Sequence, residues 1–151
     1  MTEKELCQRA KDYFFQIQKT DRLIQRLTDT VNTLRSSLTS QNYELKPDKV
    51  QTSGAKDTLG ETVVKIIALE DDINARIDEL VDLKADAMHR IQNMPDLDQQ
   101  NVLIARYING EIWKKIAVKV HFSMRQVHRI HGSALIDFAK QNLDIWQNGT
   151  P

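Results

Sequence analysis

The sequence predicts an all-α protein in which a long helical, coiled-coil-like hairpin arm precedes a C-terminal helix-turn-helix domain. Glycine (5) and proline (3) are scarce and 28% of the 151 residues are charged, a composition typical of long charged helices. Apolar residues recur at steps of three and four over two long stretches. Two shorter amphipathic patterns then flank a three-residue break between Trp113 and Ala139. We expect the arm over residues 1–95 and the helix-turn-helix domain over residues 96–147.

The first helix of the arm is predicted over residues 2–38. Thr2 and Glu5 form a capping box, which satisfies free backbone amides at the start of a helix. The apolar series that follows is Ala10, Phe14, Ile17, Ile24, Leu27, Val31, Leu34 and Leu38. A helix of this length spans roughly 55 Å, which is too long for a small globule to enclose. The series therefore needs a partner helix, in the same chain or in another copy.

A loop is predicted over residues 39–60, because proline and glycine stand there among clustered Ser, Thr and Asp. Thr58 and Glu61 form a second capping box, so a second long helix is expected to open there and to end before Pro95. Its apolar series is Val63, Ile66, Ile67, Ile73, Ile77, Leu80, Ala87, Ile91 and Met94. An antiparallel hairpin within the chain is the economical arrangement, and a homodimeric coiled coil is nearly as favourable.

Charge and cysteine content limit the classes of function. Residues 1–96 carry 14 Lys and Arg against 17 Asp and Glu, whereas residues 97–151 carry 7 against 4, so only the C-terminal part is basic. The carboxylates of the second helix lie on a solvated face without a cleft, so we expect no catalytic residues and no enzyme. A single cysteine, Cys7, excludes an intramolecular disulfide and suits a reducing compartment. A charged N-terminus and the lack of a long apolar run favour a cytoplasmic protein without membrane contact.

The C-terminal domain is predicted to hold three consecutive helices. Asp96 and Gln99 form a capping pair before the first of them, and Asn109-Gly110 closes it. The next helix runs to Val120, and Phe122 fills the turn that follows. Ser123 and Gln126 form an S-x-x-Q box at the start of the last helix. This spacing is that of a helix-turn-helix, whose second helix enters the DNA major groove.

The last helix has one apolar and one polar side. Val127, Ile130, Ala134 and Phe138 fall on the inner side, and Arg125, Arg129 and Gly132 lie opposite. Such side chains bind bases and phosphates, and lysines on the preceding helix are placed for backbone phosphates. The predicted DNA contacts are Ser123, Arg125, Gln126, His128, Arg129, Gly132 and Ser133, with Lys114, Lys115 and Lys119. Alone, the arginines would be ordinary surface charges, and the helix-turn-helix context is what favours DNA.

Three histidines, His121, His128 and His131, raise a metal hypothesis. His128 and His131 are three residues apart and can share a helix side. No cysteine or acidic ligand lies nearby in sequence, whereas zinc sites usually combine paired ligands from two segments. We therefore expect no metal and no cofactor.

The strings RYINGEIWKKIA and RQVHRIHGSAL resemble the DNA-binding region four of bacterial sigma factors. They resemble still more the related module of small phage and prophage proteins, and this likeness covers most of residues 46–140. The resemblance implies late-gene transcription regulation similar to that of the ArpU and RinA activator groups. It also implies that Arg125, Gln126 and Arg129 meet promoter DNA. His121 departs from the glycine of many such turns, and no segment resembles the promoter-melting part of a sigma factor.

The sequence thus predicts a sequence-specific DNA-binding transcription regulator of phage or prophage type. One alternative is a DNA-packaging protein, similar to a small terminase subunit, or an assembly protein that uses the same module on DNA. A second alternative is an adaptor that contacts RNA polymerase. The expected partners are promoter double-stranded DNA, RNA polymerase, and further copies of the chain joined through the helical arms as a homodimer or higher oligomer.

Overall fold

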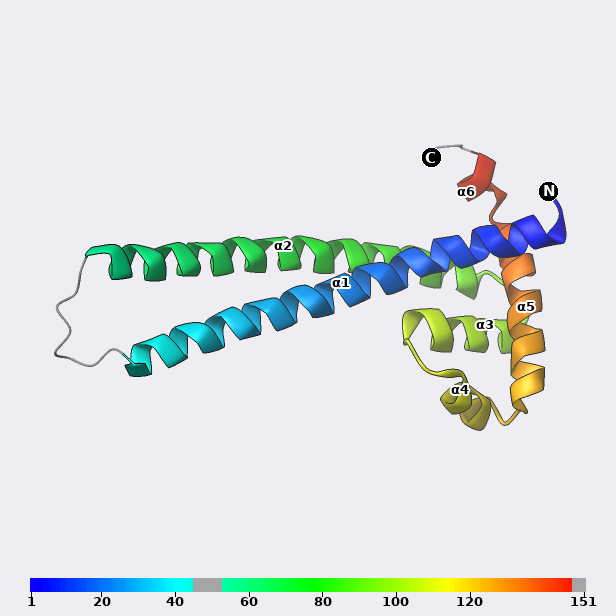
Figure 1. The fold of residues 1–151 in the computed structure, drawn as a ribbon. Coiled ribbons are helices and arrows are strands. Elements are labelled where there is room, and N and C mark those ends of the chain that lie inside the picture. The colour runs from blue at the N-terminus through cyan, green and yellow to red at the C-terminus, as the bar shows by residue number, and fades with distance from the viewer. Residues whose placement is uncertain (45–52, 148–151) are drawn as a thin grey trace. The chain divides into compact units, whose positions relative to one another are not determined.

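The structure, a computed structural model, describes residues 1–44 and 53–147, and all regular elements in these ranges are helical (Figure 1). The all-α prediction is therefore confirmed. The elements are α1 (Glu3–Glu44), α2 (Ser53–Gln92), α3 (Leu97–Leu103), the π-helical turn η1 (Ile104–Ile108), α4 (Trp113–Val120), α5 (Met124–Gln141) and α6 (Leu143–Gln147). None of the described helices is long and apolar enough to cross a membrane.

The two long helices extend further than the sequence suggested. Helix α1 continues to Glu44 and α2 already begins at Ser53, so the predicted loop over 39–60 is too long. Residues 45–52 of that loop lie outside the described residues. No Pro or Gly precedes Pro47, so nothing in the sequence ends α1 at residue 38.

The predicted start of the second helix at Thr58 is also wrong. Thr58 lies inside α2, and its carbonyl oxygen accepts a hydrogen bond from the Thr62 hydroxyl at 2.9 Å. Gly54 and Gly60 are helical as well. A helix-interior glycine costs about 1 kcal/mol relative to alanine, which weakens a helix without ending it.

The chain divides into two compact units, one formed by residues 1–19 with 80–147, and the other by residues 20–44 with 53–79. Both long helices contribute to both units. Residues 1–19, placed in the arm by the sequence, group with the C-terminal helices rather than with the rest of the arm.

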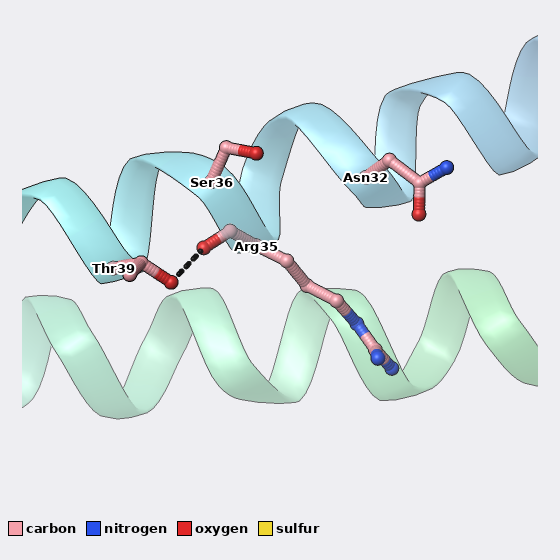
Figure 2. A pocket seen from close by; sticks show the side chains of 4 residues that line it. All are labelled: Asn32, Arg35, Ser36 and Thr39. Atoms are coloured by element: carbon pink, nitrogen blue, oxygen red, sulfur yellow. Dashed lines mark hydrogen bonds between the residues drawn. The ribbon is translucent and has the colours of Figure 1, made fainter.

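In the unit formed by residues 20–44 and 53–79, the two helices pack side by side around Val31 and Ile66, which are both buried. The Arg35 side chain reaches from α1 toward α2 (Figure 2). Its guanidinium pairs there with the Glu70 carboxylate. The Thr39 hydroxyl donates a hydrogen bond to the Arg35 carbonyl oxygen at 3.0 Å. Arg35 and Thr39 line an open depression of about 590 Å³ together with Asn32 and Ser36. The cross-helix contact is thus part apolar and part ionic.

In the other unit, the first turns of α1 form one wall of the core. Leu6, Ala10, Phe14 and Ile17 recur at helical spacing and are all buried. The Phe14 ring stacks on Tyr107 with 4.5 Å between ring centroids and lies 4.6 Å from the ring of Phe138 on α5. Burying one such aromatic side chain contributes about 1.5–3 kcal/mol. The core of the C-terminal helices is therefore completed by the N-terminus of the chain.

Polar contacts also stabilise the unit formed by residues 1–19 and 80–147. The capping box at the N-terminus is confirmed, because the Thr2 amide donates to the Glu5 carboxylate at 2.8 Å and the Glu5 amide to the Thr2 hydroxyl at 3.3 Å. Arg90 of α2 bonds Asn142 at 2.9 Å and Asp144 at 3.1 Å. The tail after α5 is thereby held against the end of α2.

Helix α3, which precedes α4 and α5, differs in detail from the prediction. The Asp96 side chain accepts bonds from the amides of Asp98 and Gln99 and caps α3, as predicted. The Gln99 side chain does not return to Asp96; its amide nitrogen donates to the Asp137 carboxylate on α5 at 2.9 Å. The helix then widens into η1, where the Asn109 amide donates to the Ile104 carbonyl oxygen at 2.9 Å.

Candidate nucleic-acid interface

The turn between α4 and α5 is set by a residue in the left-handed conformation. His121 has φ 60° and ψ 36°, and its amide donates to carbonyl oxygens of the last turn of α4. The Phe122 amide also donates to Ala117, at 3.2 Å. A left-handed residue other than glycine costs roughly 1–2 kcal/mol, although histidine adopts this conformation more readily than most. Histidine thus takes the conformation that glycine usually supplies in such turns.

Helix α5 begins with the predicted cap. The Ser123 backbone is extended, and its hydroxyl accepts a hydrogen bond from the Gln126 amide at 3.2 Å. This bond satisfies an amide that would otherwise point into solvent at the start of the helix. Ser123 therefore has a structural role at the position where the sequence also placed it as a candidate DNA contact.

The inner side of α5 packs on the preceding helices. Val127 joins Val102, Ile116 and Ala117 in one buried cluster, with Phe122 and Ile130 packed against it. Further along α5, the buried residues are Ala134, Leu135, Phe138 and Ala139. The sequence predicted Val127, Ala134 and Phe138 on this side and missed Leu135 and Ala139. Burial along this side fixes which residues of α5 remain outside.

The outer side of α5 carries the predicted polar residues. Arg125, Gln126, His128, Arg129 and Ser133 are exposed, and Gly132 is partly buried. A Cβ added at Gly132 would meet nothing within 4 Å, so a close approach from outside is open there. These side chains together form the polar face of α5.

The three lysines of α4 do not have equal surroundings. Lys114, Lys115 and Lys119 are all exposed. The Lys119 ammonium pairs with the Glu111 carboxylate, whose side chain is largely buried. A phosphate would have to compete with that carboxylate for Lys119. Lys114 and Lys115 have no ion-pair partner among the described residues, so they are the better phosphate ligands.

His128 lies against an aromatic support rather than being a free surface residue. Its ring centroid is 4.9 Å from that of Trp113, and the Arg106 guanidinium carbon lies 4.6 Å above the Trp113 ring. Arg106 also donates to the Glu111 carbonyl oxygen at 3.1 Å. The Trp113 ring therefore positions His128 at the edge of the polar face of α5.

His131 has a partner on the helix before the turn. Its Nε2 atom and the Tyr107 hydroxyl share a hydrogen bond at 2.6 Å, and its ring meets Trp113 at 4.5 Å between centroids. Burial, with nearby cationic groups such as Lys11, lowers the pKa of His131 to about 4. Burial raises the pKa of Tyr107 to about 12. Both rings are therefore uncharged near neutral pH.

The histidines do not form a metal-ligand group in the described structure. The part of the chain that is described brings no three His, Cys, Asp or Glu side chains together as metal ligands. His131 uses Nε2 for Tyr107, and His128 packs on Trp113.

Sequence reasoning missed Arg106, Tyr107 and Trp113 as the support of α5. The sequence did indicate that His131 is not a surface residue, because it follows Val127 by one helical turn and so points toward the buried side of α5. No comparable signal marked Tyr107, whose position depends on the π-helical turn η1. A shallow pocket of about 430 Å³ lies beside these residues, with Gln8, Lys11, Asp12, Phe15 and Gln18 of α1 on its opposite wall.

Comparison with known proteins places the chain in a family. The model of the DUF1492 family, described as protein of unknown function, matches residues 37–138. The chain therefore belongs to the DUF1492 family. No curated protein and no solved structure matches the sequence.

Proposed function

We propose that this DUF1492 protein is a sequence-specific DNA-binding transcription regulator of phage or prophage type. Helix α5 enters the major groove of promoter DNA, and α4 lies across the adjacent backbone. The ArpU and RinA activator groups, which the sequence resembles, are the models for such a role. The helix-turn-helix would act on a promoter without melting it.

The polar face of α5 is the observation that carries this proposal. Arg125, Gln126 and Arg129 lie within the first two turns of α5 and are exposed. The two arginines lie opposite the buried Val127, and Gln126 flanks them. Arginine binds guanine with two hydrogen bonds and glutamine binds adenine in the same way. The start of the helix is where groove-reading side chains stand in helix-turn-helix proteins.

The charge distribution of the C-terminal part supports a modest rather than a strong affinity for DNA. Residues 97–151 carry 7 Lys and Arg against 4 Asp and Glu, and one of those lysines, Lys119, is already paired with a carboxylate. Few phosphate contacts give a shallow dependence of affinity on salt, because each contact adds about 0.9 to the slope of log K against log salt. Specific base contacts and a second DNA-bound copy would raise the affinity.

Binding of the full chain to fluorescent fragments from a phage genome, across a salt series, tests the proposal. Some promoter fragments should bind much more tightly than shuffled fragments of the same composition, by roughly 10³-fold or more at physiological salt. Equal affinity for promoter and shuffled fragments at every salt concentration would exclude sequence-specific binding. Occupancy mapping in cells would then identify the promoters.

An adaptor that contacts RNA polymerase is a second candidate, favoured by one observation on α4. Val118 is 72% exposed and stands one turn after Lys114 and Lys115. An apolar side chain among lysines suits a protein surface better than a phosphate backbone. Retention of polymerase by an Arg125→Ala/Arg129→Ala variant, with loss on Val118→Asp, would favour the adaptor.

A further inference from the structure

Helix α2 carries an exposed apolar stripe that its own α1 does not cover. Val63, Val64, Ile67 and Ile77 are each between 40% and 66% exposed, although they stand on the same helix as the buried Ile66. Val63 and Ile67 are four residues apart and Ile77 follows Ile67 by ten, so the three lie along one side of α2. This side adjoins the contact with α1, where Glu70 pairs with Arg35. Helix α2 therefore has two contact sides, and α1 of the same chain occupies one of them.

The stripe is bordered by acid. Asp71 follows Ile67 by four residues and Asp78 follows Asp71 by seven, so both lie beside the stripe on one side of the helix. Residues 58–79 contain six acidic residues and only two basic residues. A helix that covers this stripe must therefore bring positive charge to its border.

Helix α1 of a second copy has that chemistry. Leu23 is 36% exposed, and Leu27 and Leu34 are partly exposed on the same side of α1. Arg22 and Arg26 are exposed next to Leu23. Within the described residues neither arginine has an ion-pair partner, and the same holds for Asp71 and Asp78.

We propose that the arms form a two-fold symmetric dimer, in which α2 of each chain packs its exposed stripe against α1 of the other chain. Charge decides this pairing, because α2 against α2 would place the acidic borders together. Two-fold symmetry repeats the contact, so each dimer holds two identical α1–α2 interfaces and four helices. The proposal does not depend on DNA binding by α5.

Charge reversal tests the pairing in full-length protein. Measured by sedimentation equilibrium, two 17.4 kDa chains should associate in the wild type. An Arg22→Glu/Arg26→Glu variant and an Asp71→Arg/Asp78→Arg variant should each dimerise at least about tenfold more weakly, because like charges then meet in both interfaces. An equimolar mixture of the two variants should restore dimers as a one-to-one heterodimer. The combination of all four substitutions in one chain should restore the homodimer.

The outcomes separate the possible occupants of the stripe. A monomeric wild type at about 100 µM, well above the dissociation constant of a stable dimer, would overturn the proposal and leave the stripe to another protein. Tighter dimers of an Asp71→Asn/Asp78→Asn variant, which removes the border charges without reversing them, would show α2 against α2 and would also overturn it, as would a ring of many subunits. Helix content of each variant, followed by circular dichroism, confirms folding. Arg76→Glu is the control, because Arg76 pairs with Asp72 at 3.2 Å on a different side of α2 and should leave the mass unchanged.

Discussion

The Tyr107 hydroxyl and His131 Nε2 lie 2.6 Å apart and join the π-helical turn η1 to the middle of α5. Trp113 at the start of α4 packs on the same histidine ring. One side chain of α5 is thus in contact with both preceding helical segments. Because α5 is one continuous helix, a contact that holds His131 against η1 and α4 also fixes the direction of the polar face of α5.

Acidification should weaken the fold through His131. Its pKa is about 4 in the folded protein and 6.5 in the free side chain, so between these values the unfolded chain binds a proton that the folded chain does not. As far as His131 is concerned, the free energy of unfolding should be highest above about pH 6.5 and should fall toward pH 4. Its protonation lowers that free energy by at most about 1.4 kcal/mol per pH unit. Urea unfolding at a series of pH values measures this. His131→Gln should flatten that dependence, whereas the exposed His89→Gln should not; identical pH profiles for wild type and His131→Gln would contradict the assignment.

His121→Gly should stabilise the protein by about 0.5–1 kcal/mol. Glycine adopts the left-handed conformation of the turn without the steric cost of a side chain, although it loses more entropy on folding. Thermal unfolding should show a rise of a few degrees. The opposite sign is expected for His128→Gly inside α5, which removes a good packing partner of Trp113 and adds a helix-interior glycine. A lowered melting temperature for His121→Gly would show that the histidine side chain itself holds the turn.

Phe14→Ala should destabilise the C-terminal helices by about 3–5 kcal/mol. The Phe14 ring is fully buried between Tyr107 and Phe138, so truncation leaves a cavity in their core. Phe15→Ala is the matched control, because Phe15 is 41% exposed and lies beside Lys19, so its truncation should cost less than about 1 kcal/mol. Similar unfolding free energies for the two variants would mean that α1 does not complete this core.

Arg129→Ala should weaken binding to a specific DNA fragment by about 1–3 kcal/mol and relax the preference at one base pair. Arg129 is exposed on the polar face of α5, so folding should not change. Fluorescence anisotropy with the wild-type site and its single-base variants measures both effects. Arg76→Ala, an equally simple truncation on α2, should leave affinity unchanged. Uniform weakening across all fragments would instead assign Arg129 to a phosphate.

Lys115→Ala should reduce the salt slope of DNA binding by about 0.9, the value for one phosphate contact. Lys119→Ala should reduce it less, because the Glu111 carboxylate already neutralises that ammonium. The comparison requires only the affinity of each variant between 50 and 200 mM salt, a range in which phosphate contacts dominate the change. An equal reduction for both lysines would show that the ion pair opens on DNA.

The sequence alone predicted the helical class, the caps at Thr2, Asp96 and Ser123, and the buried side of α5 around Val127. These features are local, because each depends on residues within one or two helical turns. The extent of α1 and α2 was missed, since Ser, Thr and Gly weakened the pattern near residues 39–60 without breaking either helix. The role of Gln99 as a partner of Asp137 was missed because the capping box offered an equally good local explanation.

Non-local contacts account for the other features that the sequence did not predict. Nothing near Phe14 indicated that its ring would meet Tyr107 and Phe138, and its spacing suited a coiled-coil arm equally well. The polar face of α5 was predictable as a face, but the support of His128 by Trp113 was not, because it depends on the angle between α4 and α5. Helical periodicity identifies which side of a helix is buried and leaves the covering element undetermined.

The Phe14–Phe138 contact joins residues 124 positions apart, which has a consequence for synthesis on the ribosome. The turns of α1 that carry Leu6, Phe14 and Ile17 are synthesised more than a hundred residues before Phe138, and these side chains stay uncovered until Phe138 has been made. Contacts of such sequence separation slow folding, because the intervening chain must be ordered before they form. Nascent chains of this protein should therefore bind chaperones through the segment that carries Leu6, Phe14 and Ile17, and a fragment that starts at residue 96 should be prone to aggregation.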